Sequence, residues 1–118
     1  MLIEKILRKK HSLSQLKKYD VNQKVIEALA DAQSRVILFS IIKQGKTAME
    51  LSEGLRIPLS SVYKKISDLE DIALVKVDKW ILSDNGKKFK IYKSRISKAD
   101  VSIKKPEPTI ILTPNDQG

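Results

Sequence analysis

The amino-acid sequence predicts an α+β fold that is mainly α-helical. In IPLSSVYKKISDLEDIALV, residues 57–75, the apolar residues Val62, Ile66 and Leu69 recur at i, i+4 and i+7, the spacing of one buried helical face. After this segment come short runs rich in β-branched and aromatic residues, which favour strands. The 118 residues, 42% of them apolar, suffice for one domain with one core. We therefore expect helices first and strands afterwards.

Residues 1–20 are expected to form an N-terminal helical extension. One apolar helical stripe is made by four residues, Leu2, Ile3, Ile6 and Leu7. Ser12, with Gln15 three residues later, is placed to restart this helix through a capping box. Asp20 directly precedes VNQKVIEALA and is expected to cap a separate helix. The stripe is a possible dimerisation surface, because a minimal domain does not need it.

Capping residues predict the boundaries of the next helices. Asp31 is placed to cap a central helix, and the apolar run of this helix, residues 36–42, is expected to be buried. Gly45 is expected to end the helix in a left-handed conformation. TAME, which starts at Thr47, is a capping box for a short helix that Gly54 stops. Pro58 then suits the entrance of the helix with the buried face described above, because proline lacks only an N–H that is not needed there.

Two strand-like runs, LVKVD and KWILS, follow. They are expected to meet in a tight hairpin at Asp78 and Lys79, which would place Lys76 and Lys79 beside its tip. Trp80 is interpreted as a core residue, with stacking on a nucleic-acid sugar as the alternative. DNG, residues 84–86, is a strong turn signal.

The C-terminal third is less regular. Residues 86–105 form a basic extension that alternates as strands do, although Phe89, Tyr92 and Ile96 would also fit one helical face; the composition favours strands. Residues 106–118 contain three prolines and are expected to be a flexible tail, in which Ile110–Leu112 could pair with a strand edge.

The charge is distributed unevenly, and the total is +9. Residues 1–20 hold six basic and two acidic side chains, residues 21–85 hold nine of each, and residues 86–105 hold eight basic and one acidic. A balanced centre with strongly basic flanks indicates a polyanionic partner, although lysines also serve solubility alone.

Several classes of function lack their residues. The chain has no cysteine and one histidine, so thiolate metal sites and cysteine nucleophiles are excluded, and no metal or cofactor is expected. It contains no phosphate-binding glycine loop, and we expect no enzyme activity. It has no apolar run long enough to span a membrane, and its N-terminal segment is not expected to be a signal peptide. The lack of cysteine fits a reducing cytoplasm, and we expect a cytoplasmic, nucleoid-associated protein.

Three helices with tight turns followed by a hairpin form the order of a winged helix-turn-helix, expected over residues 21–85. The segment ALADAQSRVILFSIIKQGKTAMELSEGLRIPLSSVYKKISDLEDIALVKV also resembles the ArsR-like family of transcriptional regulators. The lysine-rich GKKFKIYKSRI after the hairpin resembles extensions of small archaeal regulators of this general type. The resemblance lies in ALAD (28–31), ELSE (50–53), SSV (60–62), LE (69–70) and LV (74–75). It implies a regulator that binds double-stranded DNA.

Two departures limit the resemblance. ArsR-type metal sensors use cysteines and clustered histidines, so metal sensing is not carried over. Ala73 stands where the family pattern often has glycine, whereas the basic residue at Lys64 agrees with the pattern.

The recognition helix is expected at about Leu59–Ile72, lying in the major groove with its N-terminal residues toward the bases. Burial of its apolar face turns its small, polar and basic residues outward. Candidate DNA-binding residues lie in this helix, in the segments before it, and in the hairpin and basic segment. They are Ser60, Ser61, Tyr63, Lys64, Lys65, Arg35, Lys46, Thr47, Lys76, Lys79, Lys87, Lys88 and Lys90. For Arg35, an ion pair with Asp31 is the structural alternative.

Three readings of function remain open. The first is a sequence-specific, homodimeric regulator that reads a pseudo-palindromic site, with dimerisation inferred from the N-terminal stripe and from a basic segment without a role in a minimal winged helix. The second is an abundant, weakly specific chromatin protein. The third is a winged helix that binds another protein in a larger complex, because a fold does not fix a function. The operator, the regulated genes and any effector ligand cannot be read from the sequence.

Overall fold

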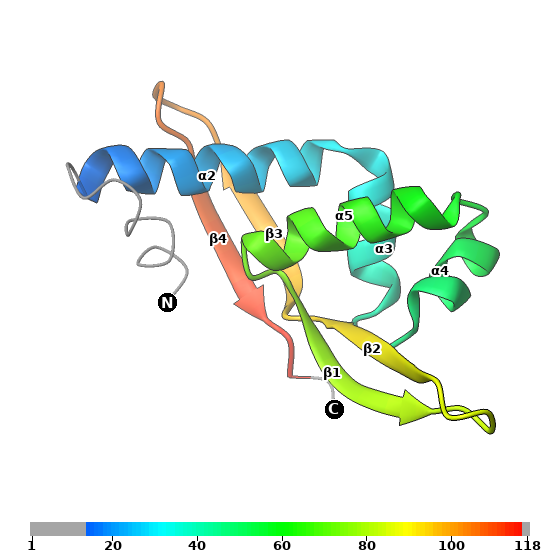
Figure 1. Cartoon of the computed structure of the whole chain (residues 1–118). Coiled ribbons are helices and arrows are strands. Elements are labelled where there is room, and N and C mark those ends of the chain that lie inside the picture. The colour runs from blue at the N-terminus through cyan, green and yellow to red at the C-terminus, as the bar shows by residue number, and fades with distance from the viewer. Residues whose placement is uncertain (1–13, 117–118) are drawn as a thin grey trace.

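A computed structural model of the chain describes the backbone of residues 14–116 and the side chains of residues 21–116 (Figure 1). Over this range four helices precede two antiparallel two-stranded sheets, which confirms the predicted α+β class. The elements in chain order are α2 (Ser14–Ala30), α3 (Ala32–Ser40), α4 (Ala48–Leu55), α5 (Leu59–Asp71), β1 (Val75–Leu82), β2 (Lys88–Ser94), β3 (Ile96–Ser102) and β4 (Thr109–Pro114). The apolar stripe at residues 2–7 and the expected cap at Ser12 lie outside the described residues.

Helix α2 runs without interruption through Asp20, so the prediction that Asp20 caps a separate helix is wrong. Residues 14–30 contain neither glycine nor proline, and nothing in this stretch stops a helix once it has begun. Asp31 does cap α3, as predicted: its carboxylate accepts the Ser34 N–H at 2.9 Å. The chain therefore turns between α2 and α3 over a single residue.

Helix α3 ends at Ser40, earlier than predicted, and only part of its apolar run is buried. Ile37, Leu38 and Ile41 are fully buried, whereas Val36 and Phe39 are exposed. Gly45 does not end the helix and has no positive φ. Its role is close packing, because a Cβ atom at this position would lie 2.6 Å from Ile91 Cγ2.

The capping box of α4 is present as predicted. The Thr47 N–H donates to Glu50 Oε1 at 2.8 Å, and the Glu50 N–H donates to Thr47 Oγ1 at 3.1 Å. Gly54, by contrast, lies within α4 and does not stop it. The helix ends one residue later, and Arg56 adopts the left-handed conformation with φ 56°.

Helix α5 begins after Pro58 and buries the predicted face. Val62, Ile66 and Leu69 are at most 1% exposed, and each contributes on the order of 1.5–3 kcal/mol when fully buried. Ala73, just after the helix, has φ 60°. That conformation explains why glycine would be common at this place in the resembling pattern.

The predicted tight hairpin at Asp78 and Lys79 is wrong. Strand β1 continues through these residues to Leu82, and Asp78 is the extra residue of an irregularity between Val77 and Lys79. The chain turns at residues 83–87, where Gly86 has φ 84° and the Ser83 N–H donates to the Lys87 carbonyl at 2.8 Å. The turn signal DNG therefore marks the real hairpin, because only it supplies a residue that readily takes positive φ.

The β1–β2 hairpin crosses the predicted domain boundary at residue 85. The first basic residues of the predicted extension thus belong to the turn and return strand of this hairpin. Dimerisation is therefore not needed to explain their presence. Residues 88–94 and 96–102 are strands, as the composition favoured. Residues 109–114, expected within a flexible tail, form β4, and the pairing predicted for Ile110–Leu112 is confirmed against β3.

One apolar core joins these elements. Buried residues of α2 to α5 meet Leu74, Val75, Tyr92 and Ile96 of the strand region, and partly buried residues of β3 and β4 pack against the same cluster. Figure 1 shows the β1–β2 hairpin extending from the helices, while β3 and β4 run in a different direction. Within residues 14–116, no helix combines the length and apolar character that a membrane crossing requires.

Candidate nucleic-acid interface

The outer face of α5 is polar and cationic in its first half. Ser60 and Lys64 lie opposite the buried face, and Tyr63, 51% exposed, lies on the flank. Ser61 is half-buried. The second half of the helix is acidic, with Asp68, Glu70 and Asp71. The basic side chains of α5 thus lie in its N-terminal half, where the helix dipole also places partial positive charge.

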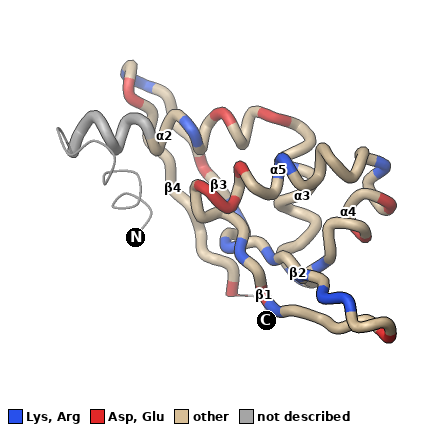
Figure 2. Tube along the Cα trace, in the orientation of Figure 1, with Lys and Arg blue, Asp and Glu red and all other residues tan. Residues whose placement is uncertain are grey.

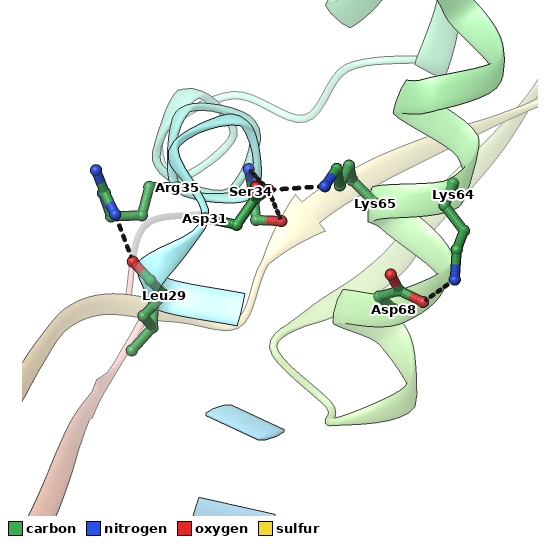
Figure 3. Close-up of polar contacts among 7 residues, drawn as sticks. All are labelled: Leu29, Asp31, Ser34, Arg35, Lys64, Lys65 and Asp68. Atoms are coloured by element: carbon green, nitrogen blue, oxygen red, sulfur yellow. Dashed lines mark hydrogen bonds and ion pairs between the residues drawn. The ribbon is translucent and has the colours of Figure 1, made fainter. Parts of the chain in front are cut away.

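Lys64 and Lys65 are neighbours in sequence but point to different places (Figure 3). The Lys64 ammonium lies 2.9 Å from Asp68 Oδ1 on the outer face of α5, and its side chain is 72% exposed. The Lys65 ammonium lies 3.0 Å from Asp31 Oδ2 at the start of α3, and its side chain is 27% exposed. Lys65 thus joins two helices, whereas Lys64 remains on the surface that the sequence assigned to DNA.

Asp31 is the centre of this junction. The Ser34 hydroxyl donates to Asp31 Oδ2 at 2.7 Å, and the Ser34 backbone N–H donates to the same oxygen. These bonds, with the Ser34 hydroxyl first and Lys65 next, lower the pKa of Asp31 from 3.8 to about 2. The carboxylate is held ionised, and it fixes α5 against the α2–α3 turn.

Arg35 does not form the predicted alternative ion pair with Asp31. Its guanidinium donates to the Leu29 carbonyl at 2.6 Å, at the end of α2 (Figure 3). This bond satisfies a terminal helix carbonyl, which is a common use of a basic side chain there. Arg35 is exposed and lies at the same junction as Lys65.

Lys46 and Thr47 connect the α3–α4 loop to the hairpin and to α4. The backbone of Lys46 pairs with Tyr92 through N–H to O distances of 3.0 and 2.8 Å. Thr47 is buried and its hydroxyl oxygen accepts the Glu50 N–H. The Thr47 side chain is therefore committed to the cap, and only the Lys46 side chain is available to a partner.

The five candidate lysines of the hairpin are exposed but do not gather at its tip. Lys76 and Lys79 belong to β1, Lys87 to the turn, and Lys88 and Lys90 to β2. The prediction that Lys76 and Lys79 flank the tip is wrong, because the strand continues beyond them. Figure 2 shows the basic segments along β2, with an acidic one at the turn.

Alternation along β2 places Lys88 and Lys90 on one face of the hairpin, whereas Lys93 of the same strand is buried. Lys88 and Lys90, with Trp80, line a hollow of about 210 Å³ that is closed by Tyr63 of α5 and by the first residues of α4. The Lys90 ammonium lies 5.3 Å from the centroid of the Trp80 ring. This hollow brings together four side chains from three elements: Tyr63 of α5, Trp80 of β1, and Lys88 and Lys90 of β2.

Trp80 is 56% exposed, so its interpretation as a core residue is wrong. It pairs with Lys90 in a part of the hairpin that extends beyond the helices. The position of the true turn at residues 84–86 was the signal in the sequence that could have placed it, because a longer β1 carries residue 80 away from the core.

Neither models of protein families nor curated proteins match this chain. Among the residues that the structure describes, no group of three or more acidic or histidine side chains is arranged to hold a metal ion.

Proposed function

We propose that the protein is a sequence-specific, DNA-binding transcriptional regulator of the ArsR-like winged helix-turn-helix type. In this proposal α3, α4 and α5 form the helical part, α5 is the recognition helix and the β1–β2 hairpin is the wing. The observation that carries the proposal is the orientation of α5: Val62, Ile66 and Leu69 are buried, and Ser60, Tyr63 and Lys64 face solvent beside the cationic face of the hairpin.

The chemistry of this surface suits a duplex. Serine and lysine at the start of a helix can donate to base edges in the major groove or to phosphates. Lys88 and Lys90, on the hairpin, are placed to hold phosphates beside the groove. Tyr63 and Trp80 offer aromatic surface to the sugar or bases between these two contacts.

We propose that the protein binds as a homodimer in the cytoplasm. Two copies of a recognition helix read half-sites about one helical turn apart, roughly 34–36 Å, which predicts a pseudo-palindromic site. The support for the dimer is the apolar stripe at residues 2–7 of the sequence. Light scattering at concentrations that saturate DNA tests it, and a monomer there would contradict it.

Selection of bound duplexes from a random DNA pool, followed by salt titration of the enriched sequence, tests the function. We expect a pseudo-palindromic consensus and an affinity that falls with salt with a log–log slope of about −0.9 for each phosphate contact. The double substitution Lys88→Glu and Lys90→Glu should weaken binding at least tenfold. The matched control, Lys104→Glu with Lys105→Glu in the β3–β4 loop, should weaken it far less. Equal losses in the two pairs, or no binding at low salt, would contradict the proposed surface.

The same titration distinguishes a sequence-specific regulator from a weakly specific chromatin protein. Specific regulators bind their site about 10³–10⁷ times more tightly than other DNA. A ratio near one, with the salt dependence retained, would favour an architectural protein that contacts phosphates only.

A protein-interaction module is the second candidate, because Trp80, Ile81 and Leu82 are exposed on one strand. Trp80 is the single tryptophan of the sequence, so its fluorescence reports directly on the hollow beside α5. We expect duplex DNA to quench or shift this emission. If a saturating duplex leaves the emission unchanged, the interaction module gains support.

A further inference from the structure

A second and larger hollow lies on the opposite face of the β1–β2 hairpin. Its volume is about 710 Å³, which is in the range of small-molecule sites. The α3–α4 loop and the first turn of α4 form one wall, and the side chains of β1 and β2 that face away from Trp80 form the other. This hollow adjoins the one proposed to contact DNA. The two share the lining residues Thr47, Met49 and Phe89, whereas Lys79 and Ile81 line only this one.

The walls of this hollow are fixed by the backbone. The Lys46 and Tyr92 backbones exchange two hydrogen bonds, at 3.0 and 2.8 Å, and the Ser94 N–H donates to the Ile41 carbonyl at 3.0 Å. Gly45 approaches β2 so closely that a side chain there would overlap Ile91. The base of the hollow is therefore fixed before a ligand arrives, which reduces the ordering cost of binding.

The apolar part of the lining is exposed to solvent. Met49 of α4, Ile81 of β1 and Phe89 of β2 all line the hollow, and each is more than a third exposed. Ile91 forms a buried part of the wall behind them. Exposed large apolar side chains that converge on one concave surface are typical of a ligand site.

The charged residues at the rim favour an anion. Three lysines line the hollow: Lys43, Lys79 and the buried Lys93. Lys43 and Lys79 do not take part in the ion pairs Lys64–Asp68, Lys65–Asp31 and Lys98–Asp100. The two carboxylates of the lining are Asp78 and Glu50. Glu50 already accepts the Thr47 N–H at the positive end of α4, so its charge is partly offset.

We infer that this hollow binds a small amphipathic organic anion, namely an aromatic carboxylate. Its ring would lie against Met49, Ile81 and Phe89, and its carboxylate would lie between Lys43 and Lys79. This binding site goes beyond DNA recognition and does not require it. A protein that binds such a compound but no duplex would retain the site and lose only the proposed function.

Calorimetric titration with 2-naphthoate, together with ¹H–¹⁵N spectra, tests the inference. We expect one molecule per chain, with shifted resonances confined to the α3–α4 loop, the start of α4 and the hairpin. The neutral analogue 2-naphthamide should bind at least fivefold more weakly. Equal affinity of the two compounds would overturn the assignment of an anion, and shifts spread over the whole protein would overturn the site.

Two substitutions of opposite sign test the electrostatics. Lys79→Glu should weaken naphthoate binding about tenfold, because an attractive charge becomes a repulsive one. Asp78→Asn should strengthen binding about threefold, because it removes a repulsive charge from the rim. Lys98→Glu makes the same charge change on β3, outside the hollow, and should leave the affinity within twofold. Equal effects of Lys79→Glu and Lys98→Glu would overturn the inference.

The apolar contact has its own matched pair. Ile81 and Leu82 are adjacent in β1 and both are exposed, but only Ile81 lines the hollow. Ile81→Asp should reduce the affinity more than tenfold, and Leu82→Asp should reduce it less than twofold. The ¹H–¹⁵N spectra establish that each variant is folded. Should Ile81→Asp not fold, Met49→Ser tests the opposite wall, and unchanged affinity in Met49→Ser would overturn the inference.

Discussion

Lys64 and Lys65 provide a test in which two adjacent residues have separate roles. Lys65→Ala removes the ion pair with Asp31. The side chain of Lys65 is 27% exposed and that of Asp31 is 38% exposed. The pKa of Asp31 is lowered from 3.8 to about 2, and the full shift corresponds to about 2.4 kcal/mol. The Ser34 hydroxyl is its largest cause, and the pair is partly screened by solvent. We therefore expect Lys65→Ala to lower the free energy of unfolding by about 0.5–1 kcal/mol.

Lys64→Ala removes an exposed ion pair with Asp68 and should change the free energy of unfolding by less than about 0.5 kcal/mol. Its effect should instead fall on DNA. Loss of one phosphate contact per chain reduces the salt slope by about 0.9, and loss of a base contact costs about 1–3 kcal/mol of affinity. Lys65→Ala should leave the salt slope unchanged.

Urea unfolding and fluorescence anisotropy with a labelled duplex, measured on both variants, check this pair of expectations. The chain length and the substitution are the same in both, so each variant controls the other. The reasoning would be refuted by a salt slope that falls equally in both, or by a larger loss of stability in Lys64→Ala than in Lys65→Ala.

Three further predictions follow from the same structure. Asp68→Asn should strengthen DNA binding several-fold in anisotropy, because it frees Lys64 and removes a negative charge from α5. Asp31 has a lowered pKa, so its contribution to stability is complete above about pH 5 and is lost as the pH falls from 3.8 toward 2. Urea midpoints should fall over this pH range in the unchanged protein, and the Asp31→Asn variant should not show this loss. Gly45→Ala should destabilise by about 1–3 kcal/mol in urea unfolding through overlap with β2, whereas Gly54→Ala, with open space and a helical backbone, should stabilise by about 0.5–1 kcal/mol; equal changes would contradict both readings.

The helices were largely predictable because their signals are local. The Asp31 cap and the Thr47 capping box each act within three residues, and the buried face of α5 follows from helical periodicity alone. The errors came where a residue that can begin or end a helix was taken to do so. Asp20 lies within a continuous α2, and α4 passes through Gly54, because a residue that can end a helix need not do so.

The hairpin was misjudged because register depends on pairing between strands. A bulge at Asp78 resembles a turn in the sequence, since one polar residue interrupts an apolar alternation in either case. The true turn is fixed by Gly86 and by hydrogen bonds that span residues 83–87. The roles of Lys65 and Trp80 were missed for a related reason. Both depend on a contact with a residue distant in sequence, Asp31 in one case and Lys90 in the other.

The β1–β2 hairpin connects the two proposed sites. Because side chains alternate along a strand, its residues divide between two faces: Trp80, Lys88 and Lys90 line the hollow beside α5, and Lys79 and Ile81 line the larger one. At its base the hairpin is tied to the α3–α4 loop by backbone hydrogen bonds, while its outer part extends from the helices. A ligand that draws this outer part toward the loop would move the lysines of the opposite face away from a duplex on α5. By linkage, DNA would then weaken the binding of the ligand by the same factor, and the two sites would form one regulatory unit.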